Sequence, residues 1–453
     1  MTTPASTEGE ISRLEQIQEY LDQDSWREAA ALLRKLQPAE IAHVLEALPL
    51  NQRQILWDLL ETDQDGETLM ELTENVRNEL LQNMHQDDIV AATEHMDVDD
   101  LADFIQELPS NVTEEVMRSL DEQDRRRLET VLSYPEDTAG GLMNTDTVTV
   151  RPEVTLDVVL RYLRQLGERV PRDTDQLFVT NRDDKYLGTL RLADLVTNDP
   201  NETVAEVMSL GVQPFNVFTP DSDVARRFEQ YDLLSAPVVD EQGHLVGRIT
   251  VDDVVDLIRE EGEHQFMGSA GLSEDEDMFA PVLESSKRRA VWLGINLLTA
   301  FLASWVIGHF EDTLERIVAL AVLMPIVASM GGVGGTQTLT LAIRGIALGQ
   351  LSSKNAGYLL AKELAVALVN GLLWAVVVGI IAGIWFHSTD IALVIAAAMI
   401  INLIAAAIVG ALLPLALDKL GIDPALAGGV LLTTVTDVVG FLSFLGLATL
   451  FLL

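Results

Sequence analysis

A single carboxylate lies deep inside the last apolar stretch of the chain. Between Pro424 and Leu453, Asp437 is the only charged residue. The stretch is long and apolar enough to predict a membrane-spanning helix, and at about 1.5 Å per residue Asp437 lies about 20 Å along it. Burying a carboxylate there costs about 2.5–3.5 kcal/mol, so it must face a partner, a cation or water. We predict that Asp437 faces an aqueous cation path; a structural carboxylate hydrogen-bonded between helices is the alternative.

Hydroxyl groups close to Asp437 could complete such a path. Thr433, Thr434 and Thr436 precede it in the sequence. Residues four apart on a helix share a face, whereas neighbouring residues point about 100° apart. Thr433, rather than Thr436, is therefore the expected companion of Asp437.

The composition favours hard cations bound by oxygen. The chain has no Cys and seven His, which excludes disulfides, thiolate metal sites and a cysteine nucleophile. Carboxylate and hydroxyl oxygens prefer ions such as Mg2+ and Ca2+. The sequence contains no HExxH motif, no nucleophile–base arrangement and no GxxxxGK[ST] motif. We therefore expect no enzyme activity and no ATP-driven step.

The negative charge is concentrated before the apolar region. The chain has 30 Lys and Arg against 70 Asp and Glu, which gives a net charge of −40. Residues 286–453 contain eight residues of each sign, so the whole excess belongs to residues 1–285. Such a surface repels nucleic acid and anionic lipid and attracts cations. The expected partners are divalent cations and a lipid bilayer, and no nucleic acid.

Residues 1–133 predict an all-α acidic domain. The opening letters MTTPASTEGE have no apolar core, so we expect no cleaved signal peptide. Further on, apolar residues recur three and four apart, for example in Ala39–Pro49 and Val98–Pro109, and both phrases end in Leu-Pro. The likeness of the two phrases suggests a helical repeat. The acidic residues form either a solvated face or a cation-sensing surface.

The middle of the chain predicts a repeated α/β unit. A strand, turn, strand and helix pattern occupies residues 134–200 and returns in residues 201–258. Aligning the copies pairs Gly188 with Gly247 and Asp194 with Asp253. The phrase LVGRITVDDVVDLI, which ends at Ile258, resembles the second half of a CBS domain. This resemblance implies a tandem CBS pair, a regulatory module for which ATP is a candidate ligand.

Residues 259–285 and 286–453 predict the connection to the membrane and the membrane domain. The first segment is polar and acidic and predicts a connecting (plug) helix. The second contains five apolar runs after the basic cluster Lys287–Arg289, which marks the cytosolic side. An odd number of spans places the N-terminus in the cytoplasm and the C-terminus outside. The predicted spans are Val291–Phe310, Leu314–Gly335, Tyr358–Phe386, Ile391–Leu417 and Ala425–Leu453.

Two of these spans are rich in small residues. The stretches are Met330–Thr338, with the letters MGGVGGTQT, and Ala427–Gly429. Glycines this dense permit close helix packing or an unwound backbone that lines a cavity. In the third span, Glu363 is expected to form a local ion pair with its neighbour Lys362.

The order of these parts, with four motifs, resembles the MgtE family of bacterial magnesium transporters and channels across essentially the whole chain. The motifs are PEDTAGGLM at Pro135–Met143, VDDVVDLI at Val251–Ile258, and the stretches Met324–Gly349 and Asp423–Phe441. The resemblance implies a multidomain fold: an acidic helical N-domain, an α/β CBS pair, a connecting helix and five transmembrane helices. It also implies a homodimer whose pore lies between protomers, with the ion site around Asp437 and with Asp423 at the cytosolic mouth.

The resemblance also implies regulatory Mg2+ sites in the acidic part. The positions that match are Asp99 and Asp103 in the helical domain, and Asp232, Asp253, Asp256 and Glu261 in and after the second CBS domain. Two positions where the best-known members carry acids hold His264 and Gln265 in this chain. In the pore, Val333 and Gly429 stand where members carry Asn.

These observations favour passive, magnesium-selective uptake across the cell (inner) membrane, closed by Mg2+ bound to the acidic domains. A single charge that crosses a membrane potential of 100 mV gains about 2.3 kcal/mol, so a divalent cation gains about 4.6 kcal/mol. Uptake driven by this gain needs no ATP. A path without a gate would overload the cell with the ion. Two alternatives remain open: transport of another divalent cation such as Co2+, Ni2+ or Mn2+, and a membrane-anchored CBS sensor that transports nothing.

Overall fold

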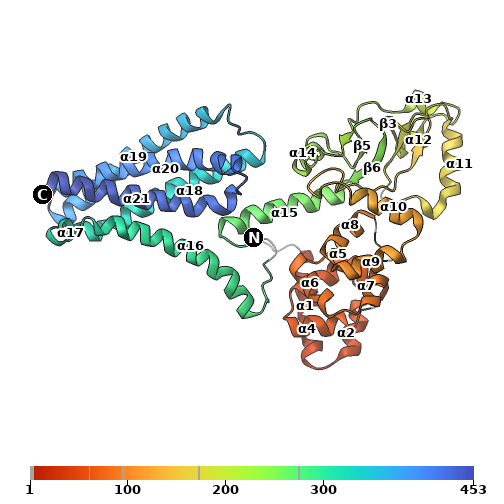
Figure 1. Cartoon of the computed structure of the whole chain (residues 1–453), viewed down its shortest axis with the longest axis horizontal. Helices are drawn as coiled ribbons and strands as arrows, with labels where there is room; N and C mark the ends of the chain where they lie inside the picture. The colour runs from red at the N-terminus through yellow and green to blue at the C-terminus, as the bar shows by residue number, and fades with distance from the viewer. Residues whose placement is uncertain (1–4, 61, 94–95, 97, 172–173, 274–275) are drawn as a thin grey trace. The chain divides into compact units, whose positions relative to one another are not determined.

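A computed structural model describes residues 5–60, 62–93, 96, 98–171, 174–273 and 276–453 (Figure 1). The chain folds into two compact units. One consists of Met1–Glu261 with Asp275–Pro281, and the other of Gly262–Glu274 with Val282–Leu453. The first contains the helical domain and the CBS pair, and the second contains the long apolar helices.

The N-terminal part is helical throughout its described residues, as predicted. Its helices are short because polar and proline residues end them; Pro49 and Pro109 occupy the N-cap positions of α4 and α9. Apolar side chains on their inner faces, such as Leu45, Leu56 and Phe104, are fully buried in one core. The helices are α1 Ala5–Asp22, α2 Trp26–Leu33, α3 Pro38–Glu46, α4 Leu50–Trp57, α5 Thr62–Met70, α6 Glu74–Asn83, α7 Gln86–Ala92, α8 Val98–Glu107, α9 Ser110–Ser119 and α10 Glu122–Val131.

The CBS pair has two three-stranded sheets of identical topology, in the orders β1-β2-β3 and β4-β5-β6. In each sheet the first pair of strands is parallel and the second antiparallel. The predicted repeat is confirmed in register, because Gly188 pairs with Val179 and Gly247 pairs with Val238. The elements are β1 Thr149–Val150, α11 Leu156–Leu166, η2 Gly167–Arg169, β2 Gln176–Thr180, β3 Tyr186–Arg191, α12 Leu192–Thr197, α13 Val204–Val207, β4 Phe215–Asn216, α14 Asp221–Tyr231, β5 Ser235–Val239, β6 Leu245–Thr250 and α15 Val251–Ser269.

The segment that carries the PEDTAGGLM motif packs on the second CBS repeat. The Gly140 N–H donates to Val217 O at 2.9 Å, and Asn144 exchanges two backbone hydrogen bonds of 2.8 Å with Arg248. A Cβ atom at Gly247 would lie 2.8 Å from Met143 Sδ, so this close approach requires glycine. The motif therefore precedes the first CBS repeat in sequence but packs on the second.

The connecting segment differs from the predicted helix over 259–285. Helix α15 begins in the second CBS repeat and runs without interruption to Ser269. A turn follows at Gly271, whose φ of +74° favours glycine and whose missing side chain leaves room for the Trp292 ring. The next helix begins at Val282. Residues 270–281 therefore separate two helices.

A buried arginine ties this connection to the helical domain. Arg53 in α4 is 0% exposed, and its guanidinium donates to both carboxylate oxygens of Asp277 at 3.0 and 3.3 Å. It also donates to Glu79 Oε2 at 2.8 Å and to the carbonyl oxygens of Leu45 and Leu48 at 3.0 and 3.1 Å. A buried guanidinium tolerates this position only because its donors are paired.

Among the described residues, five helices, all ending in the second unit, are long and apolar enough to cross a membrane, as predicted. Helix α20 is the central one, because half of the residues in its most apolar stretch are buried, whereas 11% are buried in the first span. The second span lies later than predicted because Ile317 leaves helical geometry and ends the short α17. The helices are α16 Val282–Gly308, α17 Glu311–Arg316, α18 Ala319–Ala347, α19 Ala356–Phe386, α20 Thr389–Lys419 and α21 Pro424–Leu452.

Glycine and alanine bring α18, α20 and α21 close together, as the small-residue stretches predict. A Cβ atom at Gly410 of α20 would lie 2.8 Å from Gly335 O in α18. A Cβ atom at Gly335 would lie 2.8 Å from Leu432 of α21. Any larger residue would separate the helices, so the small residues set their spacing.

Candidate cation site

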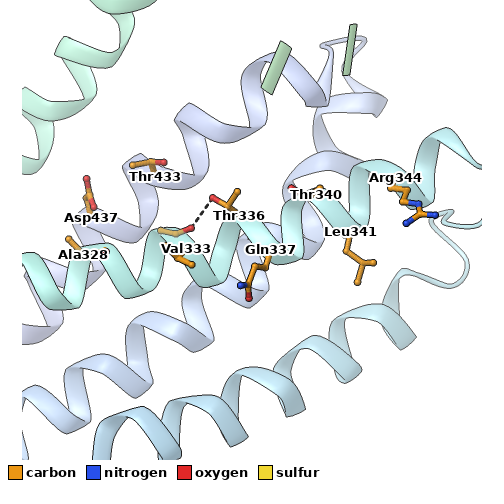
Figure 2. Close-up of a pocket in the computed structure, with 11 residues that line it drawn as sticks. Ala328, Val333, Thr336, Gln337, Thr340, Leu341, Arg344, Thr433 and Asp437 are labelled. Atoms are coloured by element: carbon orange, nitrogen blue, oxygen red, sulfur yellow. Dashed lines mark hydrogen bonds between the residues drawn. The ribbon is translucent and has the colours of Figure 1, made fainter. Parts of the chain in front are cut away.

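A pocket of about 760 Å³ lies between α18 and α21 (Figure 2). Both walls come from these two helices, and the α18 wall is built mainly from small and polar side chains. The lining residues are Ala328, Ser329, Gly332, Val333, Thr336, Gln337, Thr340, Leu341, Arg344, Thr433 and Asp437. The structure therefore brings Asp437 and Thr433 together on one wall.

The Asp437 carboxylate is partly buried and points into the pocket beside Ala328 (Figure 2). Within the described part of the chain, its side chain has no hydrogen bond or ion pair. Arg344 lines the same pocket but is 16 positions after Ala328 on α18, or about 24 Å along the helix axis. The alternative of a carboxylate satisfied between helices therefore gains no support from the described residues.

The hydroxyl groups beside Asp437 present oxygen lone pairs to the pocket. Thr433 is exposed, and its hydroxyl donates to Gly429 O at 2.9 Å. On α18 the Thr336 hydroxyl likewise donates to Gly332 O at 2.9 Å. Because each proton is used within its own helix, the oxygens remain free to accept from water. Thr436 is fully buried, in keeping with the predicted preference for Thr433 as the residue on the path.

The α18 wall contains polar residues that the sequence reasoning did not single out. These are Ser329, Thr336, Gln337, Thr340 and Arg344. The signal was present, because Thr336 and Gln337 lie within the MGGVGGTQT stretch and Thr340 and Arg344 follow Gln337 at successive spacings of three and four residues. Val333 also lines the pocket and adds an apolar side chain to this wall.

Asp423 lies apart from this pocket. It caps α21, accepts from Ala425 N at 2.8 Å, and lies 2.8 Å from His264 Nε2 at the end of α15. Fourteen positions separate it from Asp437, or about 21 Å of helix. The structure thus separates Asp423 from the two other predicted pore residues.

Behind the wall, Glu363 is buried and paired. Its carboxylate lies 2.9 Å from Lys362 Nζ and accepts from Thr338 Oγ1 at 3.0 Å. The predicted local pair is confirmed. Thr338 belongs to α18, so Glu363 also joins α19 to the wall helix.

The predicted sensor residues lie in several places in the first unit. Asp99 is 9% exposed and accepts from Asn144 Nδ2 at 3.1 Å. Asp253 accepts from the Thr250 hydroxyl at 3.0 Å. Burial and the neighbouring Asp99 raise the pKa of Asp253 to about 7. The structure therefore brings Asp99 and Asp253 together, from the helical domain and the second CBS domain.

The other predicted sensors occupy further positions in the first unit. Asp103 is one turn beyond Asp99 on α8, and Asp232 ends α14 in the left-handed conformation, with φ of +50°. Asp256 and Glu261 are exposed on α15. Among the described residues, no three His, Asp or Glu side chains are placed to hold one metal ion.

Two acidic partners were missed by the sequence reasoning. Burial, followed by the charge of Asp256, raises the pKa of Glu71. Burial, followed by Asp137 and Glu261, raises the pKa of Asp221. Each missed residue faces a predicted sensor from another segment of the chain, which no local motif reveals.

Comparisons with known proteins agree along nearly the whole chain. The MgtE family model, described as a divalent cation transporter, matches residues 324–447; the MgtE intracellular N domain matches 36–137, and the CBS domain matches 139–201 and 204–260. "Magnesium transporter MgtE" of Thermus thermophilus is 31% identical over 96% of this chain and 98% of its own. The Bacillus subtilis protein of the same name is 29% identical over 94% of both chains. The crystal structure titled as the cytosolic domain of the Mg2+ channel MgtE in complex with ATP is 31% identical, with a TM-score of 0.49, and covers 54% of this chain and 99% of that one.

The raised pKa of Asp253 predicts that stability without divalent cations depends on pH. Unfolded aspartate has a pKa of about 3.9, whereas the folded value is about 7. The contribution of this group to stability is therefore full below about pH 4 and is lost as the pH rises to about 7. We expect Asp253→Asn, which can still accept from Thr250, to gain stability over the parent chain between about pH 5 and pH 8, by at most about 4 kcal/mol.

Thermal or denaturant unfolding of the purified chain in chelator measures this gain. Asp194→Asn changes the equivalent residue of the first repeat and serves as the control. A gain that does not vary with pH would contradict the assignment.

Proposed function

Because the chain belongs to the MgtE family of magnesium transporters, we propose that this multi-pass membrane protein conducts Mg2+ passively along the pocket between α18 and α21. The observation that carries this proposal is the Asp437 carboxylate, which faces the pocket from inside a membrane-length helix without a described protein partner. A charge in that position needs a cation or water beside it.

The pocket suits a hydrated ion. Water occupies about 30 Å³ per molecule in the liquid, so six waters need about 180 Å³, well below the pocket volume of about 760 Å³. Mg2+ holds its six oxygens tightly and dehydrates slowly, so a path that leaves most of that shell in place permits faster passage. Asp437 would attract the ion, and the oxygens of Thr433 and Thr336 would accept from its water.

A homodimer would place two such walls around one path, as the family resemblance implies. Two Asp437 carboxylates facing one cavity repel each other unless a divalent cation or a proton lies between them. This repulsion favours divalent over monovalent cations without a rigid cage. Asp423, at the cytosolic end of α21, would then lie at the mouth.

The acidic first unit supports the proposal of closure by Mg2+. Asp99 and Asp253 meet across two domains, and burial together with the charge of Asp99 raises the pKa of Asp253, so ionising both carboxylates has a cost. A bound divalent cation would remove this cost and hold the domains together, which closes the path if the ion binds the closed form more tightly. Asp103, Asp232, Asp256 and Glu261 remain predicted contributors, and ATP at the CBS pair remains a prediction.

The orientation follows from charge. The Lys287–Arg289 cluster at the start of α16 supports a cytoplasmic position for the acidic unit and the N-terminus. With five spans, the C-terminus would lie outside the inner membrane. In this orientation the acidic unit would be exposed to the cytoplasmic concentration of Mg2+. We propose that the protein acts as a transporter and not as an enzyme.

Replacing Asp437 should abolish most transport. We expect Asp437→Asn to reduce Mg2+ uptake into proteoliposomes by more than tenfold, since loss of only about 1.4 kcal/mol of ion attraction gives that factor. A Mg2+-sensitive dye inside the vesicles measures the rate. Asp390→Asn, at the exposed start of α20, is the matched control.

Equal rates for Asp437→Asn and the parent chain would contradict the proposed path. A parent chain that transports nothing would favour a sensor. Faster uptake of Co2+, Ni2+ or Mn2+ than of Mg2+ would identify a different cargo.

Removing one carboxylate of the Asp99–Asp253 pair should weaken closure. In vesicles whose cytosolic face is accessible, we expect Asp99→Asn and Asp253→Asn to raise the Mg2+ concentration that halves transport by about fivefold or more. Asp194→Asn should leave this concentration unchanged. The same inhibition in all four proteins would refute regulation through this pair.

A further inference from the structure

A buried amide contacts both helices that form the pocket. Asn402 lies in the middle of α20 and is 1% exposed. Its Nδ2 donates to Val327 O of α18 at 2.9 Å. Its Oδ1 is buried without a hydrogen-bond partner among the described residues. An apolar side chain would avoid the unfavourable burial of an unpaired acceptor, so packing alone does not explain an amide at this position.

Glycines on both neighbouring helices make room for this amide. A Cβ atom at Gly331 of α18 would lie 2.2 Å from Asn402 Nδ2, and one at Gly440 of α21 would lie 2.7 Å from it. Neither helix could approach so closely with any other residue. The Asn402 amide is therefore in contact with α18 and α21 at the same level.

This level is that of the Asp437 carboxylate. Val327 and Gly331 flank Ala328 and Ser329, which line the pocket, and Gly440 is three residues beyond Asp437 on α21. The amide thus lies behind the wall and fixes the two backbones that hold the carboxylate and the surface opposite it. Displacement of either helix would change the width of the pocket at this carboxylate.

We propose that Asn402 is a positioning residue that sets the selectivity of the path between divalent cations of different hydration. This inference rests on the proposed Mg2+ path. We expect the native width of the pocket to match the compact, tightly held water shell of Mg2+ and to exclude Ca2+, which is larger and more weakly hydrated. A shift of the helices would change this width and weaken the exclusion of Ca2+. Asn402 touches no ion and acts through α18 and α21.

The test compares uptake of Mg2+ and Ca2+ by full-length protein in proteoliposomes. We expect Asn402→Leu to lower the ratio of Mg2+ rate to Ca2+ rate by about fivefold or more, because a displacement near 1 Å can change rates by up to about a hundredfold. Thr313→Val is the control, since Thr313 is buried and hydrogen-bonded to Thr449 at 2.8 Å in the same unit. It should leave the ratio unchanged.

A purely structural Asn402 would lower both rates in proportion, and that result would overturn the inference. If Asn402→Leu does not fold, Asn402→Ser is measured instead, and the same two results decide. Failure of the parent chain to carry Mg2+ would refute the proposed function, which is a different outcome from an unchanged ratio.

A second, independent observation concerns the Arg53–Asp277 ion pair. Asp277 precedes α16 by five residues, which span at most about 17 Å when extended. We infer that this pair is a tether through which the helical domain acts on the first membrane helix. A rearrangement of the helical domain would move the start of α16 once this short segment is taut.

The readout is closure by Mg2+ in the full-length protein. We expect Asp277→Asn to leave uptake unchanged without Mg2+ on the cytosolic face and to raise the half-inhibitory Mg2+ concentration by about fivefold or more. Arg53 retains Glu79 and two carbonyl oxygens in this variant, so the domain keeps its fold. Glu276→Gln, which alters the adjacent acid, is the control.

Unchanged inhibition in Asp277→Asn, when the parent chain is inhibited, would overturn the tether. A parent chain that Mg2+ does not inhibit would refute the proposed closure and the tether with it.

Discussion

A carboxylate inside a membrane-crossing helix can be kept only where the neighbouring helix leaves polar space beside it. In α18 that space comes from Ala328, Ser329 and Gly332, which are too small to cover Asp437. The same helix must also pack closely on α20, and Gly331 and Gly335 allow it. The glycine-rich stretch therefore serves two faces of one helix: it opens a pocket on one side and permits tight contact on the other.

The acidic unit obeys a related constraint. It keeps like charges close together, at Asp99 with Asp253 and at Asp221 with Glu261, where burial raises the pKa of Asp253 and of Asp221. Each pair joins segments that are distant in sequence, so its repulsion acts between parts of the fold and not along one helix. A cation or a proton that enters such a pair therefore changes how the segments fit, which ordinary surface acids do not do.

The sequence predicted correctly those features that depend on a single segment of the chain. Helical spacing separated Thr433 from Thr436, hydropathy found the five long helices, and the internal repeat placed Gly188 and Gly247 in equivalent register. It failed at contacts between distant segments: nothing beside Asn402 in sequence indicates Gly331 or Gly440, and nothing beside Asp277 indicates Arg53. It also misplaced the start of the second span, because hydropathy does not detect the backbone break at Ile317.

The contact between His264 and Asp423 shows how a single residue type can change what a position needs. Family resemblance places an acid at 264, and two carboxylates 2.8 Å apart would repel unless a cation lay between them. The imidazole of His264 lies at that distance from the carboxylate and can donate to it directly. The end of α15 can thus hold the start of α21 without a metal ion at this point.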